Sequence, residues 1–205
     1  MFKRALLLSL ILAAGCASTP PAPPPTEPHP HVLLQTSAGD ITLELDHDNA
    51  PISVDNFLTY VREGHYDGTV FHRVIRGFVV QGGGYDAQLH DRPRHAQIKL
   101  ESYNGLPNLR GSLAMAREEA PDSADAEFYI NLVDNHKLDP QPDNPARRWG
   151  YAVFGRVLIG MDVVDRIAAE PTHTAANGMS DVPVKPVLIR KATLLPPANP
   201  PPASQ

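Results

Sequence analysis

The sequence predicts a mainly β protein in which a closed antiparallel barrel is capped by two α-helices. Many short apolar segments are separated by turn residues, as in small barrels. Only two segments show the spacing of an amphipathic helix. The 205 residues, 42% hydrophobic and 20% charged, suit a single globular domain with a core of its own.

The first elements expected are a hairpin and a helix. Segments 32–36 and 41–45 have the composition of strands, and the turn residues 37–40 between them indicate a hairpin. Pro51 then favours the first turn of a helix, because its missing N–H is not needed there. Apolar residues recur at helical spacing after it, and Gly64 ends the helix.

The middle of the chain is expected to begin with a strand over 70–75. Its alternation places Val70, His72 and Val74 on one face and the intervening residues, including Arg73, on the other. After a turn at 76–77, strands are expected at 78–80, 98–100, 112–116, 128–132, 152–158 and 187–193, a second helix at 161–169, and a proline-rich loop at 140–148.

Proline defines the ends of the domain. Of the 22 prolines, seven lie between Pro20 and Pro30 and five between Pro196 and Pro202. We therefore expect one domain over 32–195, a semi-rigid tether over 16–31 that extends about 3 Å per residue, and a disordered tail over 196–205. A disordered leader without a mechanical role is the alternative for the tether.

The first 15 residues have the form of a secretion signal: a basic start followed by an apolar run too short to span a bilayer. Small residues before Cys16, the only cysteine, resemble the bacterial lipobox, in which the cysteine is lipidated. Ala17 rather than aspartate follows it, which in the bacterial lipoproteins that this segment resembles favours the outer membrane over the inner one. We expect a lipid-anchored protein on the periplasmic side of a bacterial envelope. The alternative is a plain signal peptide with Cys16 incidental.

The stretch 70–84, VFHRVIRGFVVQGGG, has an unusual composition for a strand pair. Arg73 stands among β-branched and aromatic residues, and an apolar patch and Gln81 follow closely. A guanidinium beside an apolar pocket suits a ligand that is half apolar and half amide, such as a prolyl peptide. An arginine that faces solvent in a surface salt bridge is the alternative.

This stretch closely resembles the FHRxIxGFxxQGG signature of the cyclophilins, which are peptidyl-prolyl cis-trans isomerases. The resemblance covers residues 31–195 and implies a closed eight-stranded barrel, prolyl isomerase activity, proline-containing polypeptides as partners and no cofactor. Further matching motifs follow in the family's order: GSLAMAR at 111–117, EFYIN at 127–131, KLD at 137–139 and YAVFG at 151–155.

The resemblance also implies roles for individual residues. Arg73 would donate to the prolyl nitrogen, and Gln81 would orient Arg73 and contact the substrate backbone. Phe128 is expected in the core rather than in the site. The remaining substrate-binding residues implied are Phe78, Val79, Tyr129 and Leu138 around the proline ring, Ala116 and Arg117 along the preceding residues, and Glu127 and Tyr151.

Three positions depart from the best-known pattern of the family. Glu127 replaces a glutamine, and we hypothesise that it pairs with Arg73, restrains it and lowers turnover, so that Glu127→Gln would raise activity. Lys137 replaces a tryptophan that many members use to bind cyclosporin, so we expect weak cyclosporin binding. Tyr151 replaces a histidine, as is common in bacterial members.

Other functions have little support in the sequence. The nine histidines form no HExxH or Cys/His cluster, so no metal site is expected. A formal net charge of −5 gives no indication of nucleic-acid binding, and a monomer is expected. A weakly active or inactive cyclophilin-fold chaperone that binds proline-containing segments is the alternative to an enzyme, and an envelope scaffold is a third possibility.

Overall fold

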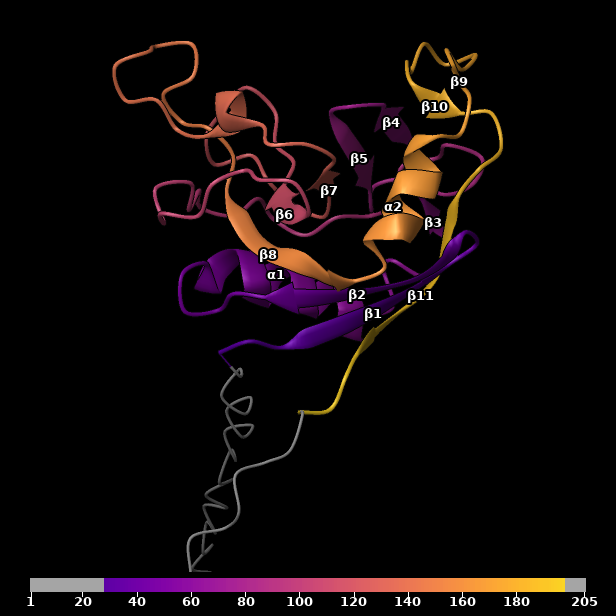
Figure 1. Cartoon of the computed structure of the whole chain (residues 1–205), viewed down its shortest axis with the longest axis horizontal. Helices are drawn as coiled ribbons and strands as arrows, with labels where there is room; N and C mark the ends of the chain where they lie inside the picture. Colours follow the sequence, from indigo (N-terminus) through magenta and orange to yellow (C-terminus); the bar gives the residue numbers. More distant parts are fainter. Residues whose placement is uncertain (1–27, 198–205) are drawn as a thin grey trace, which may run out of the picture.

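The computed structural model describes residues 28–197, and its main feature is one curled antiparallel sheet (Figure 1). Its nine strands follow the order β3-β11-β1-β2-β8-β6-β7-β5-β4. Their bounds are β1 His31–Thr36, β2 Gly39–Leu45, β3 Thr69–Val70, β4 Arg73–Ile75, β5 Val79–Gly82, β6 Ser112–Met115, β7 Phe128–Asn131, β8 Val153–Ile159 and β11 Leu188–Leu194.

The predicted hairpin lies inside this sheet, as its third and fourth strands. β1 pairs with β2 on one side and with β11 on the other, and β2 continues to β8. In β2, Ile41, Leu43 and Leu45 are buried, whereas Thr42 and Glu44 between them are only half-buried. This period of two faces the apolar side chains inward and fixes the register of the hairpin.

The two edge strands of the sheet are consecutive in the chain, so the sheet must curl to bring its edges together. β3 forms one edge and β4 the other, and only two residues separate them. The mainly β class is confirmed, and the sheet forms a half-barrel. The closed eight-stranded barrel is not confirmed, because the described sheet has nine strands, with β3 and β4 at its edges.

The break between β3 and β4 corrects the alternation expected along 70–75. Phe71 and Val74 both belong to the main core, whereas Arg73 is only half-buried. The backbone explains this: Phe71 N donates to Val187 O and Val74 N to Asp181 O, so the chain leaves the regular ladder here. Phe71 and Arg73 consequently do not share a face as a continuous strand would require.

Two helices complete the core, as predicted. Helix α1 (Pro51–Arg62) starts with its proline, and helix α2 (Met161–Ala168) follows β8. The Phe57 ring of α1 lies 5.4 Å from the ring of Phe128 and 5.3 Å from that of Phe154, centroid to centroid. Side chains of both helices join the same buried cluster, so one core supports the sheet and both helices.

Some short elements differ from the prediction. The strand expected at 98–100 is only a single bridge between Ile98 and Ala124. A 3₁₀ turn η1 (His136–Leu138) and a two-stranded sheet of β9 (Thr172–His173) and β10 (Val182–Pro183) were not expected. Two or three residues carry too little periodicity to be recognised in a sequence.

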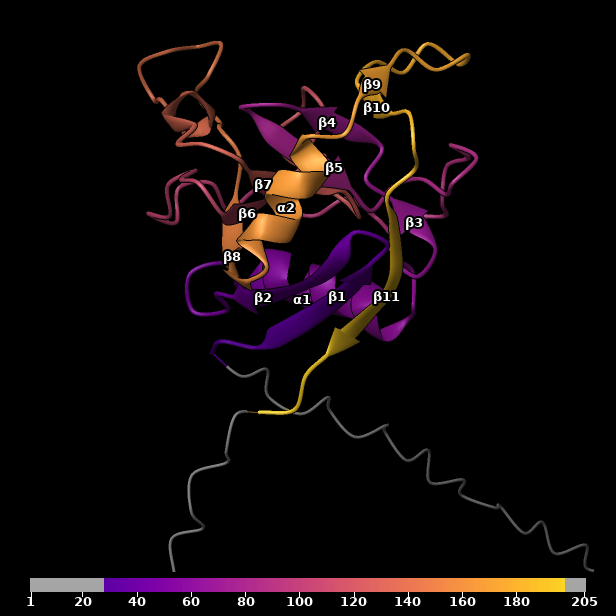
Figure 2. The same ribbon diagram turned by 45° about the vertical axis from the view of Figure 1, so that its right-hand side comes forward.

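The two ends of the described chain lie side by side, because Leu195 N donates to His31 O. In both Figure 1 and Figure 2, β4 and β5 lie at the opposite end of the domain. Within residues 28–197, no helix is long and apolar enough to cross a membrane. The predicted signal peptide, Cys16 and most of the tether and tail lie outside the described residues.

Candidate active site

Arg73 and Gln81 are brought together by the pairing of β4 and β5. The two residues are opposite each other in the antiparallel ladder, which places their side chains on the same face. Arg73 Nη1 donates to Gln81 Oε1 over 3.1 Å. No carboxylate among the described residues forms an ion pair with Arg73, so its charge stays available to a ligand.

A cavity of about 180 Å³ opens beside this pair. Nine of the ten pocket residues predicted from the sequence line it, on three strands, η1 and the loops between them. These residues are Arg73, Phe78, Val79, Gln81, Ala116, Arg117, Tyr129, Leu138 and Tyr151.

The floor of the cavity is a small apolar cluster separate from the main core. Val79, Ala114, Tyr129 and Val153 are buried in it. Phe128, one residue before Tyr129, is fully buried in the main core instead, as predicted. Neighbouring positions of β7 therefore serve opposite faces of the sheet, one for stability and one for the site.

Buried amides hold the cavity floor from below. Tyr129 Oη donates to Asn108 Oδ1 over 2.8 Å, and Asn131 Nδ2 donates to the same oxygen over 3.1 Å. Asn135 Nδ2 donates to Asn131 Oδ1 and to Phe78 O. Burial raises the pKa of Tyr129 well above its ordinary value, so its hydroxyl remains a donor. A satisfied buried network of this kind fixes side-chain positions.

Two cations border the cavity through aromatic rings. The guanidinium of Arg117 lies 4.7 Å from the centroid of the Tyr151 ring, and Arg117 Nε donates to Gly150 O. The ammonium of Lys137 lies 4.2 Å from the centroid of the Phe78 ring. Arg117 is thus held in place, and Lys137 lies on the ring of Phe78, one of the residues that line the cavity.

Glu127 does not pair with Arg73, and this part of our hypothesis was wrong. Its Oε2 accepts a hydrogen bond from Gln81 Nε2 over 2.7 Å and lies 3.3 Å from His72 Nε2. Its Oε1 lies 2.9 Å from Arg94 Nη2. The glutamine that separates Glu127 from Arg73 bonds to both, so the carboxylate reaches the arginine only indirectly.

Glu127 also lies outside the cavity that the other predicted residues line. It borders a neighbouring cavity of about 450 Å³, which shares Gln81, Ala116 and Arg117 with the first. Burial opposes the charge of Glu127, yet the hydrogen bonds from His72 and Gln81 and the charge of Arg94 hold its pKa below the ordinary value. Glu127 is therefore ionised at neutral pH.

Sequence reasoning missed several supporting residues. Arg94 belongs to the charged, irregular loop after β5, where no periodicity indicates a direction for its side chain. Asn108 and Asn135 lie in loops as well, and only the fold brings them beneath the cavity. Within the described part of the chain, no group of three or more His, Cys, Asp or Glu side chains is arranged to hold a metal ion.

Comparison with known proteins agrees with this geometry. Residues 31–194 match the family model described as cyclophilin type peptidyl-prolyl cis-trans isomerase/CLD. Peptidyl-prolyl cis-trans isomerase cyp18 of Streptomyces antibioticus is 51% identical over 164 residues, which are 80% of this chain and 98% of that protein. Peptidyl-prolyl cis-trans isomerase B of Escherichia coli is 47% identical over 164 residues, with the same coverage of each chain.

The fold has solved counterparts too. A crystal structure of a Cryptosporidium parvum cyclophilin type peptidyl-prolyl cis-trans isomerase superposes with a TM-score of 0.65 at 24% identity. The match covers 84% of this chain and 99% of that one. The family model, the two bacterial relatives and the site that the sheet assembles lead to one conclusion: this chain belongs to the cyclophilin-type peptidyl-prolyl cis-trans isomerases, enzymes that accelerate the isomerisation of X-Pro bonds.

Proposed function

We propose that this isomerase acts, as a monomer, on X-Pro bonds of folding proteins in a bacterial cell envelope, with Arg73 as the residue that stabilises the transition state. The observation that carries the role of Arg73 is its position: a guanidinium without a carboxylate partner among the described residues, held by Gln81 at the edge of a cavity with an apolar floor.

The reaction needs no nucleophile and no metal. Amide resonance opposes rotation about the X-Pro bond with a barrier of roughly 18–20 kcal/mol. In the transition state the amide is twisted, and its nitrogen becomes pyramidal and basic. A fixed donor aimed at that nitrogen stabilises the twisted amide more than the planar one, which is the condition for catalysis.

The cavity would hold the proline ring against Phe78, Val79 and Tyr129, next to the guanidinium. Ala116 and Arg117 lie at the junction of the two cavities, where the residues before proline would run. Gln81 has its carbonyl on Arg73 and would keep the fork of the guanidinium directed at the bound amide.

An isomerisation assay on an Ala-Pro tetrapeptide tests this function. We use the chain from residue 28 onward, which keeps every helix and strand described. Uncatalysed prolyl isomerisation takes tens of seconds or more. A rate well above this uncatalysed rate supports the assignment as an enzyme. A folded protein that binds proline peptides without accelerating the reaction would instead be a binding module, the alternative function.

The location in the envelope rests on the basic start, the apolar run and Cys16. The described chain begins at the end of the domain opposite β4 and β5 (Figures 1 and 2), so a tether at that end would leave the site facing away from the membrane. Lipid chains contribute roughly 0.8 kcal/mol per buried methylene, so two or three of them anchor a protein firmly.

Cys16→Ser is expected to release the protein from the membrane. In a bacterial host fed a radiolabelled fatty acid, the wild-type chain should become labelled and sediment with the outer membrane. The variant should remain unlabelled because serine cannot form the thioether. Release of the unlabelled wild-type chain into the periplasm would instead indicate a plain signal peptide.

Cyclosporin is expected to bind weakly, with a dissociation constant in the micromolar range or above. Lys137 places an ammonium where many members have an indole, and this side chain lies on Phe78, at the wall of the cavity. A lysine lacks both the apolar area and the fixed N–H of tryptophan. Lys137→Trp should tighten binding in calorimetric titrations; nanomolar binding by the wild type would contradict this account.

A further inference from the structure

We propose that Arg94 and Glu127 act as a pair of positioning residues, which fix the orientation of the Gln81 amide and through it the guanidinium of Arg73. The inference rests on the proposed role of Arg73. Neither residue of the pair contacts Arg73 itself, and Arg94 comes from a loop that the sequence marks only as charged and irregular.

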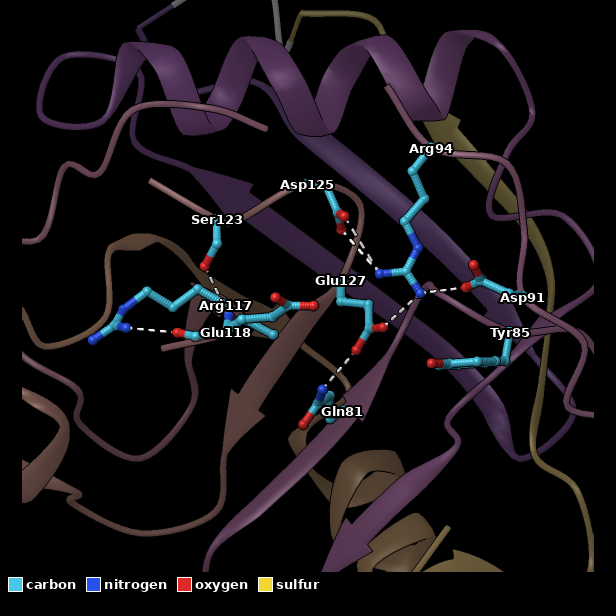
Figure 3. Close-up of a pocket in the computed structure, with 10 residues that line it drawn as sticks. Gln81, Tyr85, Asp91, Arg94, Arg117, Glu118, Ser123, Asp125 and Glu127 are labelled. Atoms are coloured by element: carbon cyan, nitrogen blue, oxygen red, sulfur yellow. Dashed lines mark hydrogen bonds and ion pairs between the residues drawn. The ribbon is translucent and has the colours of Figure 1, made fainter. Parts of the chain in front are cut away.

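The contacts form a continuous chain from the loop to the catalytic arginine. Arg94 Nη2 lies 2.9 Å from Glu127 Oε1, and Glu127 Oε2 accepts from Gln81 Nε2 over 2.7 Å. Gln81 Oε1 in turn accepts from Arg73 Nη1 over 3.1 Å. Figure 3 shows the Glu127 carboxylate between Arg94 on one side and Gln81 on the other.

The polarity of these bonds is the reason that a carboxylate matters here. An ionised carboxylate can only accept hydrogen bonds, so the side of Gln81 that faces Glu127 must be its NH₂ group. The carbonyl of Gln81 then faces Arg73, which can only donate. Glu127 therefore selects the one orientation of the amide that suits the arginine.

Arg94 keeps Glu127 ionised and in place. The Glu127 side chain is only 13% exposed, and a charge at such a depth is costly without a partner. The guanidinium is itself held: Nη2 lies 2.5 Å from Asp91 Oδ1, Nη1 donates to Asp125, and the group lies 5.5 Å from the centroid of the Tyr85 ring. These contacts hold the Arg94 guanidinium in its position against Glu127.

The third glycine of the 70–84 stretch makes room for the carboxylate. A Cβ on Gly84 would lie 2.5 Å from Glu127 Oε1 and 2.8 Å from its Cδ. Its backbone is not in the left-handed region, so an alanine there would conflict with the position of Glu127 rather than with the chain. Gly84→Ala is therefore a second way to displace the carboxylate without changing any charge.

The pair reverses our expectation for Glu127→Gln. A glutamine has one acceptor and one donor group, whereas Gln81 and Arg94 both donate. If its oxygen faces Gln81, its NH₂ faces the Arg94 guanidinium; if it turns over, Gln81 must turn its own NH₂ toward Arg73. Either arrangement sets donor against donor, so activity should fall rather than rise.

The test is a double-mutant cycle on the isomerisation assay with the chain from residue 28. Arg94→Met and Glu127→Gln should each lower kcat/KM by about tenfold, because a small misplacement of a catalytic group is costly. The double variant should fall no further than the worse single variant, because the introduced glutamine can then present its oxygen to Gln81 and its NH₂ to an uncharged neighbour. Arg94→Lys, which keeps the charge, should retain most of the activity.

Arg92→Met is the matched control. Arg92 lies in the same loop and donates to the backbone oxygens of His65 and Asp67, so its loss loosens the loop without touching Glu127. Its kcat/KM should stay within about twofold of the wild type. Equal losses in Arg92→Met and Arg94→Met would overturn the proposal, since loop stability would then explain both.

The pH profile gives a readout that loop stability would not move. The charged and titratable groups around Glu127 are His72 and Arg94, with Asp91 and Asp125 beyond the guanidinium. Without Arg94, burial is less opposed and the pKa of Glu127 rises. As the pH is lowered, the activity that requires ionised Glu127 is therefore lost at a higher pH in Arg94→Met than in the wild type. Glu127→Gln, which has no carboxylate at this position, should lack this acid limb of the pH profile.

The outcomes separate the positioning pair from the proposed function. Wild-type activity in Arg94→Met and Gly84→Ala, or losses that simply add in the double variant, would reject the pair while leaving Arg73 as the catalytic donor. Undiminished activity in Arg73→Ala would reject the proposed mechanism itself. A tenfold loss in both single variants, no further loss in the double variant and an acid limb moved upward support the pair.

Discussion

Arg73→Ala is expected to lower kcat/KM for an Ala-Pro tetrapeptide by about 100-fold to 1,000-fold, the usual effect of removing a donor that acts only in the transition state. The variant keeps the apolar floor of the cavity, where Phe78, Val79 and Tyr129 would still hold the proline ring without the guanidinium. Peptide binding should therefore weaken much less than turnover. Exchange measurements by NMR give both quantities in one experiment.

Arg76→Ala is the matched control for this change. Arg76 lies three residues further along the chain, exposed in the turn between β4 and β5, and lines neither of the two cavities at the site. Its removal should leave kcat/KM unchanged. Arg73→Lys keeps a cation but loses the planar fork that Gln81 engages, so it should recover only part of the loss. A variant Arg73→Ala with nearly full turnover would mean that another group stabilises the twisted amide.

Arg73 and the residues of its pocket were predicted from the resemblance of the 70–84 stretch and the later motifs to the cyclophilin signature, and strand geometry then brings them together. Arg73 and Gln81 meet through a short hairpin, and the distance along the chain between them is only eight residues. Likewise, alternation along β7 separates Phe128 from Tyr129 and sends them to different clusters. Pairing across a short hairpin and alternation along one strand involve residues close together in the chain, so both can be recognised in the sequence.

The environment of Glu127 could not be predicted in the same way. Arg94 reaches it from a loop without periodicity that is distant in the sequence, and Tyr129 meets Asn108 only after the 106–110 loop folds beneath the sheet. Hydrogen-bond polarity depends on which groups finally face each other, and composition gives no information on that. This is why the unusual carboxylate was recognised from the sequence but its partner was not.

The extent of the sheet had a similar limit. The strand expected at 98–100 has apolar residues at its ends, yet only Ile98 pairs, with Ala124. Lys99 Nζ and Leu100 N instead bond to the carboxylate of Asp122. The Asp122 side chain thus takes the backbone N–H of Leu100 that a neighbouring strand would have bonded, which ends the pairing after one residue.

Phe128→Ala is expected to destabilise the domain by about 3–5 kcal/mol. The ring is fully buried and meets three aromatic neighbours edge-on, with centroid distances of 5.4 Å to Phe57, 5.5 Å to Tyr66 and 6.3 Å to Phe71. These neighbours come from α1, the segment before β3 and the break before β4, so the ring joins the helix to both edges of the curled sheet. Its removal leaves a cavity that three separate elements would have to close.

Urea unfolding of the chain from residue 28, followed by circular dichroism, measures this loss of unfolding free energy. In a thermal scan of the same variant, the melting temperature should fall by roughly 10 °C. Ile130→Val is the control: Ile130 is fully buried in the same core from the same strand, and its truncation removes a single methylene, at a cost of about 1 kcal/mol. A loss no greater in Phe128→Ala than in Ile130→Val would mean that the core refills the space. The catalytic face of β7 would then depend less on the aromatic cluster behind it than the packing of Phe128 implies.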